Sequence, residues 1–221
     1  MMSEVSFRGF FRAASISAIL AGVFLAAGIT LAIASSISID KSANDLLAQI
    51  HAHRFLFVTS IGAFLLSGIF TIPLMPALYL ALKEVQHTYA LLSLTVGVTG
   101  VMSNLTDNIL SYSLARLSER FSASDGVGKI ASAAAADVIL SSSRVAFALT
   151  LLLFGAGTFI ISWAMLKATF PRLLSGLGIV TGISSIIGGM LLPVFFLAVI
   201  PSNVLYIIWF IGLGYTLYRR R

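Results

Sequence analysis

Cysteine is absent from this chain of 221 residues, and charged side chains make up only 10% of it. Without cysteine there is no disulfide, no thiolate nucleophile and no iron–sulfur ligand. A soluble domain usually carries about a quarter charged residues, because its surface faces water. Here 58% of the residues are hydrophobic and the mean hydropathy is +1.02. The composition therefore indicates a protein whose surface faces lipid.

Long apolar runs are abundant. A helix needs about 20 apolar residues to cross the hydrocarbon core of a bilayer, and only helices or closed barrels satisfy their backbone amides in lipid. The runs here are continuous, which favours helices. They predict an all-α, polytopic membrane protein, a bundle of six transmembrane helices in one domain (1–221). The predicted spans lie near residues 13–38, 55–82, 89–115, 145–166, 173–199 and 204–217.

The net charge of +6 comes from basic residues that stand in ones and twos at the ends of the apolar runs. This distribution argues against nucleic acid as a partner and is typical of membrane orientation signals. The connections that hold Arg12, Lys83 and Lys167 contain few acids, whereas the opposite loops mix both signs. We therefore expect both termini on the cytoplasmic side of the cell membrane.

Two segments on the predicted outer side favour short helices. Ser42 and Asp45 have capping-box spacing ahead of apolar positions that share one face, which predicts a short interfacial helix at the outer membrane surface. In the connector at residues 116–144, Gly126 interrupts the chain before an alanine-rich run at residues 130–136. Alanine favours helix, so we expect an outer helical connector that continues into the fourth span.

Prolines and glycines within the spans predict bends and close contacts. Pro73 and Pro76 fall in the second run, where proline removes backbone hydrogen bonds and kinks a helix. Gly178 and Gly182 have the spacing that lets membrane helices approach closely, so the fifth run is expected in the bundle interior. A functional hinge is the alternative interpretation of these residues.

Asp107 is the acidic residue inside a predicted span. A charged side chain at the bilayer centre costs about 2.5 kcal/mol or more, so it normally faces a partner or a wet cavity. Asn104, Asn108 and Ser111 stand at helical spacing beside it and form one polar stripe in the outer third of the membrane.

This stripe predicts an outward-facing polar binding pocket, in which Arg144 or Arg54 supplies the counter-charge for Asp107. The alternative is a structural cluster that fastens helices together. The residues predicted to line the pocket are Asn104, Asp107, Asn108, Tyr112, Arg144, Asn203, Tyr206, His53 and Arg54.

Metal and enzyme signatures are missing. His51 and His53 offer two imidazoles, but a zinc site needs three or four ligands, and His87 belongs to the opposite side of the predicted membrane. The sequence contains no zinc-protease, serine-hydrolase or phosphate-loop motif. We expect no metal, no cofactor and no catalytic residue.

Several short stretches resemble one family. Residues 45–51 precede the second span, residues 77–83 close it, residues 170–178 carry a Pro-Arg turn into the fifth span, and residues 201–212 open the last one. These stretches resemble the six-span prokaryotic membrane family catalogued as domain of unknown function family 4386. The resemblance covers roughly residues 12–219 and implies a fold and a membrane location, but no activity.

Two positions depart from the pattern of that family. Asn203 stands six residues before Trp209, where the family usually has glutamate, and Gly97 stands where its third span typically has arginine. A polar site shared with the family is therefore not expected.

Three functions remain open. The first is a non-catalytic scaffold, sensor or accessory subunit that binds membrane lipids, another membrane protein or a second copy of itself. The second is a small carrier or permease for a cation or a proton-coupled solute, using the Asp107 region. The third is an intramembrane enzyme, which the missing motifs disfavour.

Overall fold

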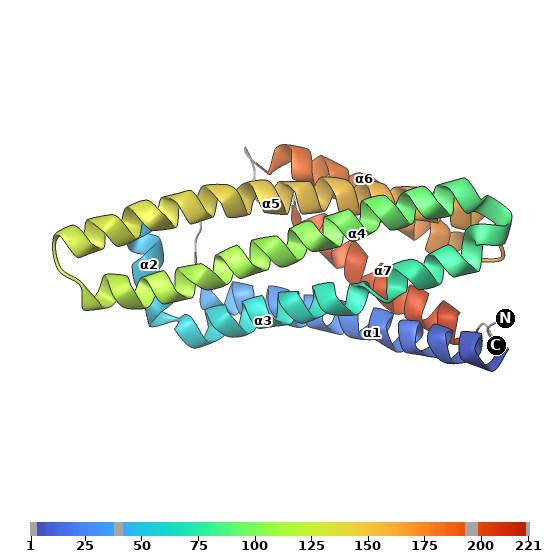
Figure 1. Cartoon of the computed structure of the whole chain (residues 1–221), viewed down its shortest axis with the longest axis horizontal. Coiled ribbons are helices and arrows are strands. Elements are labelled where there is room, and N and C mark those ends of the chain that lie inside the picture. Colours follow the sequence, from blue (N-terminus) through green and yellow to red (C-terminus); the bar gives the residue numbers. More distant parts are fainter. Residues whose placement is uncertain (1–3, 38–41, 193–198, 220–221) are drawn as a thin grey trace.

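The computed structural model is an all-α bundle of long helices that run along one axis (Figure 1). It describes residues 4–37, 42–192 and 199–219, and these contain no strand, so the predicted all-α class is confirmed. The helices are α1 (Glu4–Ser35), α2 (Ala43–Ala52), α3 (Arg54–Thr71), α4 (Leu74–Ala123), α5 (Val127–Leu166), α6 (Arg172–Leu191) and α7 (Ile200–Arg219).

The six long helices pack as neighbours in a closed ring. Helix α1 contacts α3 and α7, α3 contacts α4, α4 contacts α5, α5 contacts α6, and α6 contacts α7. The ring encloses a core that includes Trp209, Leu78, Ile161 and Met165, all nearly or fully buried. Large apolar side chains such as Leu173 and Ile33 are exposed on the outside, as expected for a surface that faces lipid.

In the part of the chain that the structure describes, five helical runs are long and apolar enough to cross a bilayer: Gly9–Ser35, Arg54–Ala123, Val127–Leu166, Arg172–Leu191 and Ile200–Arg219. The polytopic membrane bundle is thus confirmed. The predicted second and third spans both fall within Arg54–Ala123.

Two breaks divide the run Arg54–Ala123. Helix α3 ends at Thr71, and α4 begins after Pro73, as the proline pattern predicts. Pro76 lies in the first turn of α4, where its missing amide costs no helical bond. Gln86 then leaves helical geometry, with φ −142° and ψ 59°, and α4 turns back along the bundle (Figure 1).

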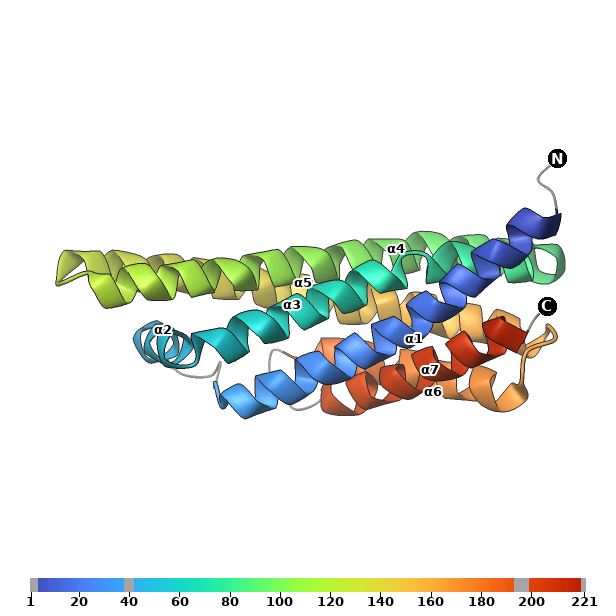
Figure 2. The same cartoon turned by 90° about the horizontal axis from the view of Figure 1, so that it is seen from below.

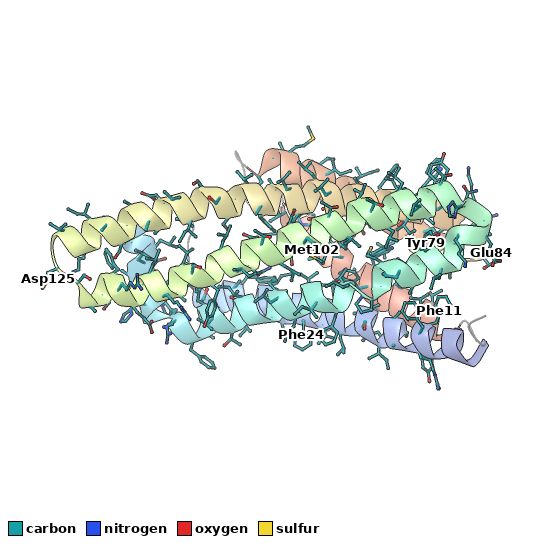
Figure 3. All side chains as sticks on the ribbon, in the orientation of Figure 1. Phe11, Phe24, Tyr79, Glu84, Met102 and Asp125 are labelled. Atoms are coloured by element: carbon teal, nitrogen blue, oxygen red, sulfur yellow. The ribbon has the colours of Figure 1, made fainter. Side chains whose placement is uncertain are left out.

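The first residues of α1, the end of α7 and Glu84 lie at one end of the molecule, called here the termini end (Figures 1 and 3). Asp125 lies at the opposite end, called the hairpin end because α4 and α5 are joined there (Figure 3). The connecting turn contains Gly126 with a positive φ of 44°, a conformation that glycine adopts without strain.

The hairpin of α4 and α5 is longer than a bilayer requires. Helix α5 has 40 residues, which correspond to about 60 Å, whereas a hydrocarbon core is about 30 Å thick. Its segment Val145–Leu166 contains no charged residue, whereas residues 127–144 contain Lys129, Asp137 and Arg144. The charged residues of α5 thus all lie in residues 127–144, and Val145–Leu166 alone is long enough to cross the hydrocarbon core.

Helix boundaries differ from the predicted spans at several points. Helix α4 continues to Ala123 rather than ending near residue 115, and α7 begins at Ile200 rather than near residue 204. Helix α5 runs without a break from the alanine-rich segment into the fourth span, as predicted. Helix α6 ends at Leu191, and the predicted end of that span at residues 193–198 lies outside the described residues, as does residue 38 of the first span.

The short helix α2 has the predicted cap. The hydroxyl of Ser42 accepts a hydrogen bond from the amide of Asp45 at 3.3 Å and lies 2.7 Å from Asp45 Oδ2, to which it donates. This cap satisfies an amide that the first turn of a helix leaves unpaired. The predicted short helix is confirmed.

The apolar face of α2 packs against the hairpin of α4 and α5. Its three apolar side chains are at most 1% exposed and pack against Leu114 of α4 and Ala136 of α5. They are Leu46, Leu47 and Ile50. Figure 1 shows α2 running between α4 and α5 near the hairpin end, and Figure 2 shows it beside the hairpin, so this helix supports the hairpin.

Glycines bring the helices into backbone contact. A Cβ atom placed on Gly100 of α4 would lie 2.5 Å from the backbone nitrogen of Phe154 in α5. A Cβ atom on Gly182 of α6 would lie 2.7 Å from the carbonyl oxygen of Gly155 in α5. The glycine face of α6 thus packs closely on α5, whereas Val180 and Met190 on its other face are 54% and 69% exposed, so the fifth run is a member of the ring and is not enclosed in the bundle interior.

Candidate functional site

Asp107 forms a small cluster between α4 and α5. The hydroxyl of Ser143 donates a hydrogen bond to Asp107 Oδ1, and it lies 3.4 Å from the hydroxyl of Ser111. Since Ser143 precedes the uncharged segment Val145–Leu166, the cluster lies at the edge of the region that lipid covers. A carboxylate there is close to headgroups and costs less than one at the bilayer centre. The cluster joins two helices, as the structural alternative expects.

The neighbouring asparagines flank Asp107 along α4, Asn104 on the side of the reversal at Gln86 and Asn108 on the side of the hairpin end. Asn108 is buried, and its Nδ2 donates to the backbone oxygen of Asn104 at 2.8 Å and to Asn104 Oδ1 at 3.3 Å. Asn104 itself lies beside Gly68 of α3. The predicted stripe therefore has two directions: Asp107 and Ser111 face α5, and Asn104 faces the interior of the ring.

The basic candidates lie at the hairpin end. Arg54 Nη2 forms an ion pair with Glu119 Oε1 at 2.7 Å, so it is the counter-charge of Glu119 rather than of Asp107. Arg144 is exposed on α5 next to the Asp107 cluster, and Tyr112 is exposed on α4.

The two histidines lie at the junction of α2 and α3. His53 lies between the two helices, and its backbone amide donates a hydrogen bond to the backbone carbonyl of Gln49 at 3.0 Å. His51 Nε2 lies 3.3 Å from the hydroxyl of Ser122, which ties this junction to α4. Among the described residues, no three histidine or acidic side chains gather as metal ligands would.

A cavity of about 80 Å³ lies inside the ring, against the core residues Val101, Phe154 and Phe210. Three predicted residues line it: Asn104 from α4, and Asn203 and Tyr206 from α7. The centroids of the aromatic rings of Phe154 and Tyr206 lie 5.2 Å apart, and both side chains form part of the cavity wall. All six helices of the ring contribute side chains, so the cavity exists only when the bundle is assembled.

Four hydroxyl residues of the cavity wall escape sequence reasoning. Single serines and threonines are common in membrane helices because they bond to nearby backbone, so they give no periodic signal. Ser67 donates to the carbonyl of Ala21 at 2.9 Å, and Ser185 donates to that of Leu151 at 2.8 Å. The four residues are Ser67, Thr71, Thr150 and Ser185.

A second hollow lies on the projecting hairpin, where α2 meets α4 and α5. Lys129 Nζ lies 5.6 Å from the centroid of the Phe121 ring, a cation–π geometry. The walls of this hollow contain a basic side chain (Lys129), an acidic side chain (Asp137) and apolar side chains. The lining residues are Asn44, Phe121, Lys129, Ile130, Ala133, Ala134 and Asp137.

Comparisons with known proteins identify the family of the chain but no activity. A search of curated proteins and a search of solved structures each found no match. A family model described as "Domain of unknown function (DUF4386)" matches residues 16–220, which is nearly the whole chain and includes α1 from residue 16 onward and all of α2 to α7. The chain therefore belongs to the DUF4386 family.

Proposed function

We propose that this protein is a non-catalytic accessory subunit of the cell membrane that binds another membrane protein through the projecting part of α5. One observation carries the proposal. The side chains of Val127, Ile130 and Val138 are 82%, 71% and 66% exposed on the segment that lipid does not cover. Large exposed apolar surfaces in water usually mark interaction sites.

The shape of this surface favours a helical partner that also crosses the membrane. Exposed positions Val127, Ala131, Ala134 and Val138 follow each other at alternating spacings of four and three residues, which places them on one face of α5. The same face continues through the exposed Val145 into the lipid-covered part. A partner that follows this face must therefore extend from the bilayer into the aqueous phase.

The brace beneath the hairpin supports the same function. Burial of three apolar side chains of α2 against α4 and α5 holds the projecting segment in one position. A rigid surface loses less conformational entropy on binding than a mobile one. This rigidity explains why the fold includes a helix too short to cross a membrane.

We further propose six crossings, with the chain reversal at Gln86 in the cytoplasm and the projecting hairpin outside. The basic residues of the termini end support this orientation: Arg12, Lys83, Lys167 and Arg172 stand there with few acids. The hairpin end mixes both signs. The reversal at Gln86 divides one apolar run into two antiparallel crossings.

The absence of cysteine makes a site-specific test direct. Ala131→Cys places a thiol on the exposed face of α5, and Ala48→Cys is the matched control on an exposed position of α2. In intact cells an impermeant maleimide should label both. A thiol-linked photo-crosslinker in native membranes should then join Ala131→Cys, but not Ala48→Cys, to a membrane-spanning protein, and adding Val138→Glu should abolish the adduct.

The other outcomes would contradict the proposal. An adduct of twice the mass of the chain would identify a second copy as the occupant, and an adduct with lipid alone would make the face part of the lipid boundary. Equal adducts from both positions would show that contact is unspecific. Labelling of neither position in intact cells, but of both in inverted vesicles, would reverse the orientation.

A second candidate is a small carrier or permease for a cation or a proton-coupled solute. The observation that favours it is the cavity lined by Asn104, which stands one helical turn before Asp107 on α4. Proton influx into proteoliposomes that contain a pH-sensitive dye tests it. A carrier should lose this flux in Asp107→Asn, which keeps an acceptor for Ser143 but cannot ionise. Flux equal to that of empty liposomes would dismiss the candidate.

A further inference from the structure

We propose that the cavity inside the ring is a binding site for a small neutral molecule that both donates and accepts hydrogen bonds, of the size and class of a short-chain amide. The proposal does not depend on the docking function of α5. It rests on the cavity's hydrogen-bonding groups, its charge and its size.

The hydroxyl groups of the wall are already paired, whereas the amide groups are not. Thr150 donates to the carbonyl of Ala146 at 2.9 Å, as Ser67 and Ser185 donate to other carbonyls. By contrast, the side chain of Asn203 forms no hydrogen bond to any described residue, and Asn104 uses its oxygen for Asn108 but not its amide nitrogen.

These two asparagines thus offer the cavity at least two donors and one acceptor. Asn203 provides a carbonyl oxygen and an NH₂ group, and Asn104 adds its NH₂ group. A polar group in an apolar environment costs free energy unless it is paired. A ligand with one acceptor and one donor would pair with groups on two different helices, α4 and α7, at once.

The cavity excludes a charged ligand on energetic grounds. Among the described residues, none that lines the cavity is Asp, Glu, Lys or Arg, and apolar or aromatic side chains such as Leu25, Val101 and Phe210 form much of the wall. Desolvation of an ion without a counter-charge costs several kcal/mol even after relaxation. Asp107, which does carry a titratable group, points to Ser143 and is not among the lining residues.

Size limits the ligand to a few heavy atoms. A cavity needs about 10–15 Å³ to hold one water molecule, so about 80 Å³ holds several waters or one molecule such as acetamide. The apolar wall formed by Phe154 and Phe210, whose ring centroids lie 6.2 Å apart, suits the methyl group of such a molecule. A ligand this small binds weakly, with a dissociation constant in the millimolar range.

The test compares acetamide with acetate, which has nearly the same shape but carries a charge. Saturation-transfer NMR detects millimolar binding of either probe to the full chain in lipid nanodiscs, with empty nanodiscs as the blank. Asn203→Leu removes the hydrogen bonds while keeping the side-chain volume, and Asn44→Leu is the matched control at an exposed asparagine of α2. Asn104→Leu serves as a second cavity variant if the first fails to fold.

We expect saturable binding of acetamide but not of acetate, and a loss of affinity of about tenfold in Asn203→Leu, the effect of one lost hydrogen bond. Asn44→Leu should bind acetamide as the unaltered chain does. The proposal is overturned if acetamide gives no more signal than empty nanodiscs, which would leave water as the occupant. It is also overturned if acetate binds equally well, or if neither cavity variant weakens binding.

Discussion

Gly100 offers a quantitative test of the packing that holds the ring closed. A Cβ atom at this position would lie 2.5 Å from the backbone nitrogen and 2.8 Å from the Cα atom of Phe154. Backbone atoms cannot rotate away as a side chain can. In Gly100→Ala, helices α4 and α5 must therefore move apart by about 1 Å to reach an ordinary contact distance, because a well-packed interior has no spare room.

The expected magnitude follows from two opposing effects. A gap of about 0.5–1 Å forfeits a quarter to a half of the attraction between the separated atoms, and overpacking typically costs about 1–3 kcal/mol. Alanine regains up to about 1 kcal/mol through its better helix propensity. Subtracting about 1 kcal/mol from about 1–3 kcal/mol leaves a net loss in the free energy of unfolding of about 0–2 kcal/mol.

Gly62 of α3 provides the matched control, because a Cβ atom there would meet nothing within 4 Å. Gly62→Ala should be neutral or stabilising by up to about 1 kcal/mol. Unfolding of each variant by titration with sodium dodecyl sulfate in mixed micelles, followed by circular dichroism, measures the difference. If Gly100→Ala unfolds at the same detergent fraction as Gly62→Ala, the close approach of α4 and α5 does not determine stability and the reasoning fails.

Three further predictions concern the hairpin and the helix contacts. Leu47→Ala should cost about 2–5 kcal/mol of the local stability of α2, because truncation of this fully buried side chain leaves a cavity. Hydrogen exchange of the α2 amides should accelerate, and unchanged exchange would mean that other contacts hold α2 in place. A double-mutant cycle of Arg54→Gln and Glu119→Gln should give less than about 1 kcal/mol, since both side chains are 47% exposed, and a larger coupling would require a drier ion pair. Ser93→Ala removes the 2.8 Å hydrogen bond to the carbonyl of Gly157 and should cost about 0.6–1.7 kcal/mol in micelle unfolding, and no cost would show that the carbonyl finds another donor.

Much of the fold was predictable because lipid imposes simple requirements on a chain. A run such as residues 145–166 must be helical and must be about as long as the bilayer is thick, so composition alone identifies it. The break at Pro73 follows from the chemistry of one residue, and the cap at Ser42 follows from another. These features depend only on neighbours in the sequence.

The site was predictable only in part. Asn104, Asn203 and Tyr206 were identified because a polar group in an apolar run needs a reason, and the structure places all three on one cavity. The same argument grouped Arg54 with Asp107, but the partner of Arg54 is Glu119. In the sequence, Asp107 and Glu119 are equally good partners for Arg54, because only charge and predicted depth in the membrane are known at that point.

The sequence by itself determined that the chain is helical, that it belongs in a membrane, and where proline and glycine interrupt or tighten its helices, because each of these depends on local geometry and on the cost of transfer from water to lipid. Only the tertiary structure decided that the apolar face of α2 packs on the hairpin, that α4 and α5 project together, and that six helices surround a cavity lined by two asparagines. These features depend on which helices become neighbours, and small residues such as Gly100 and Gly182 decide that through backbone contacts that no periodic pattern reveals.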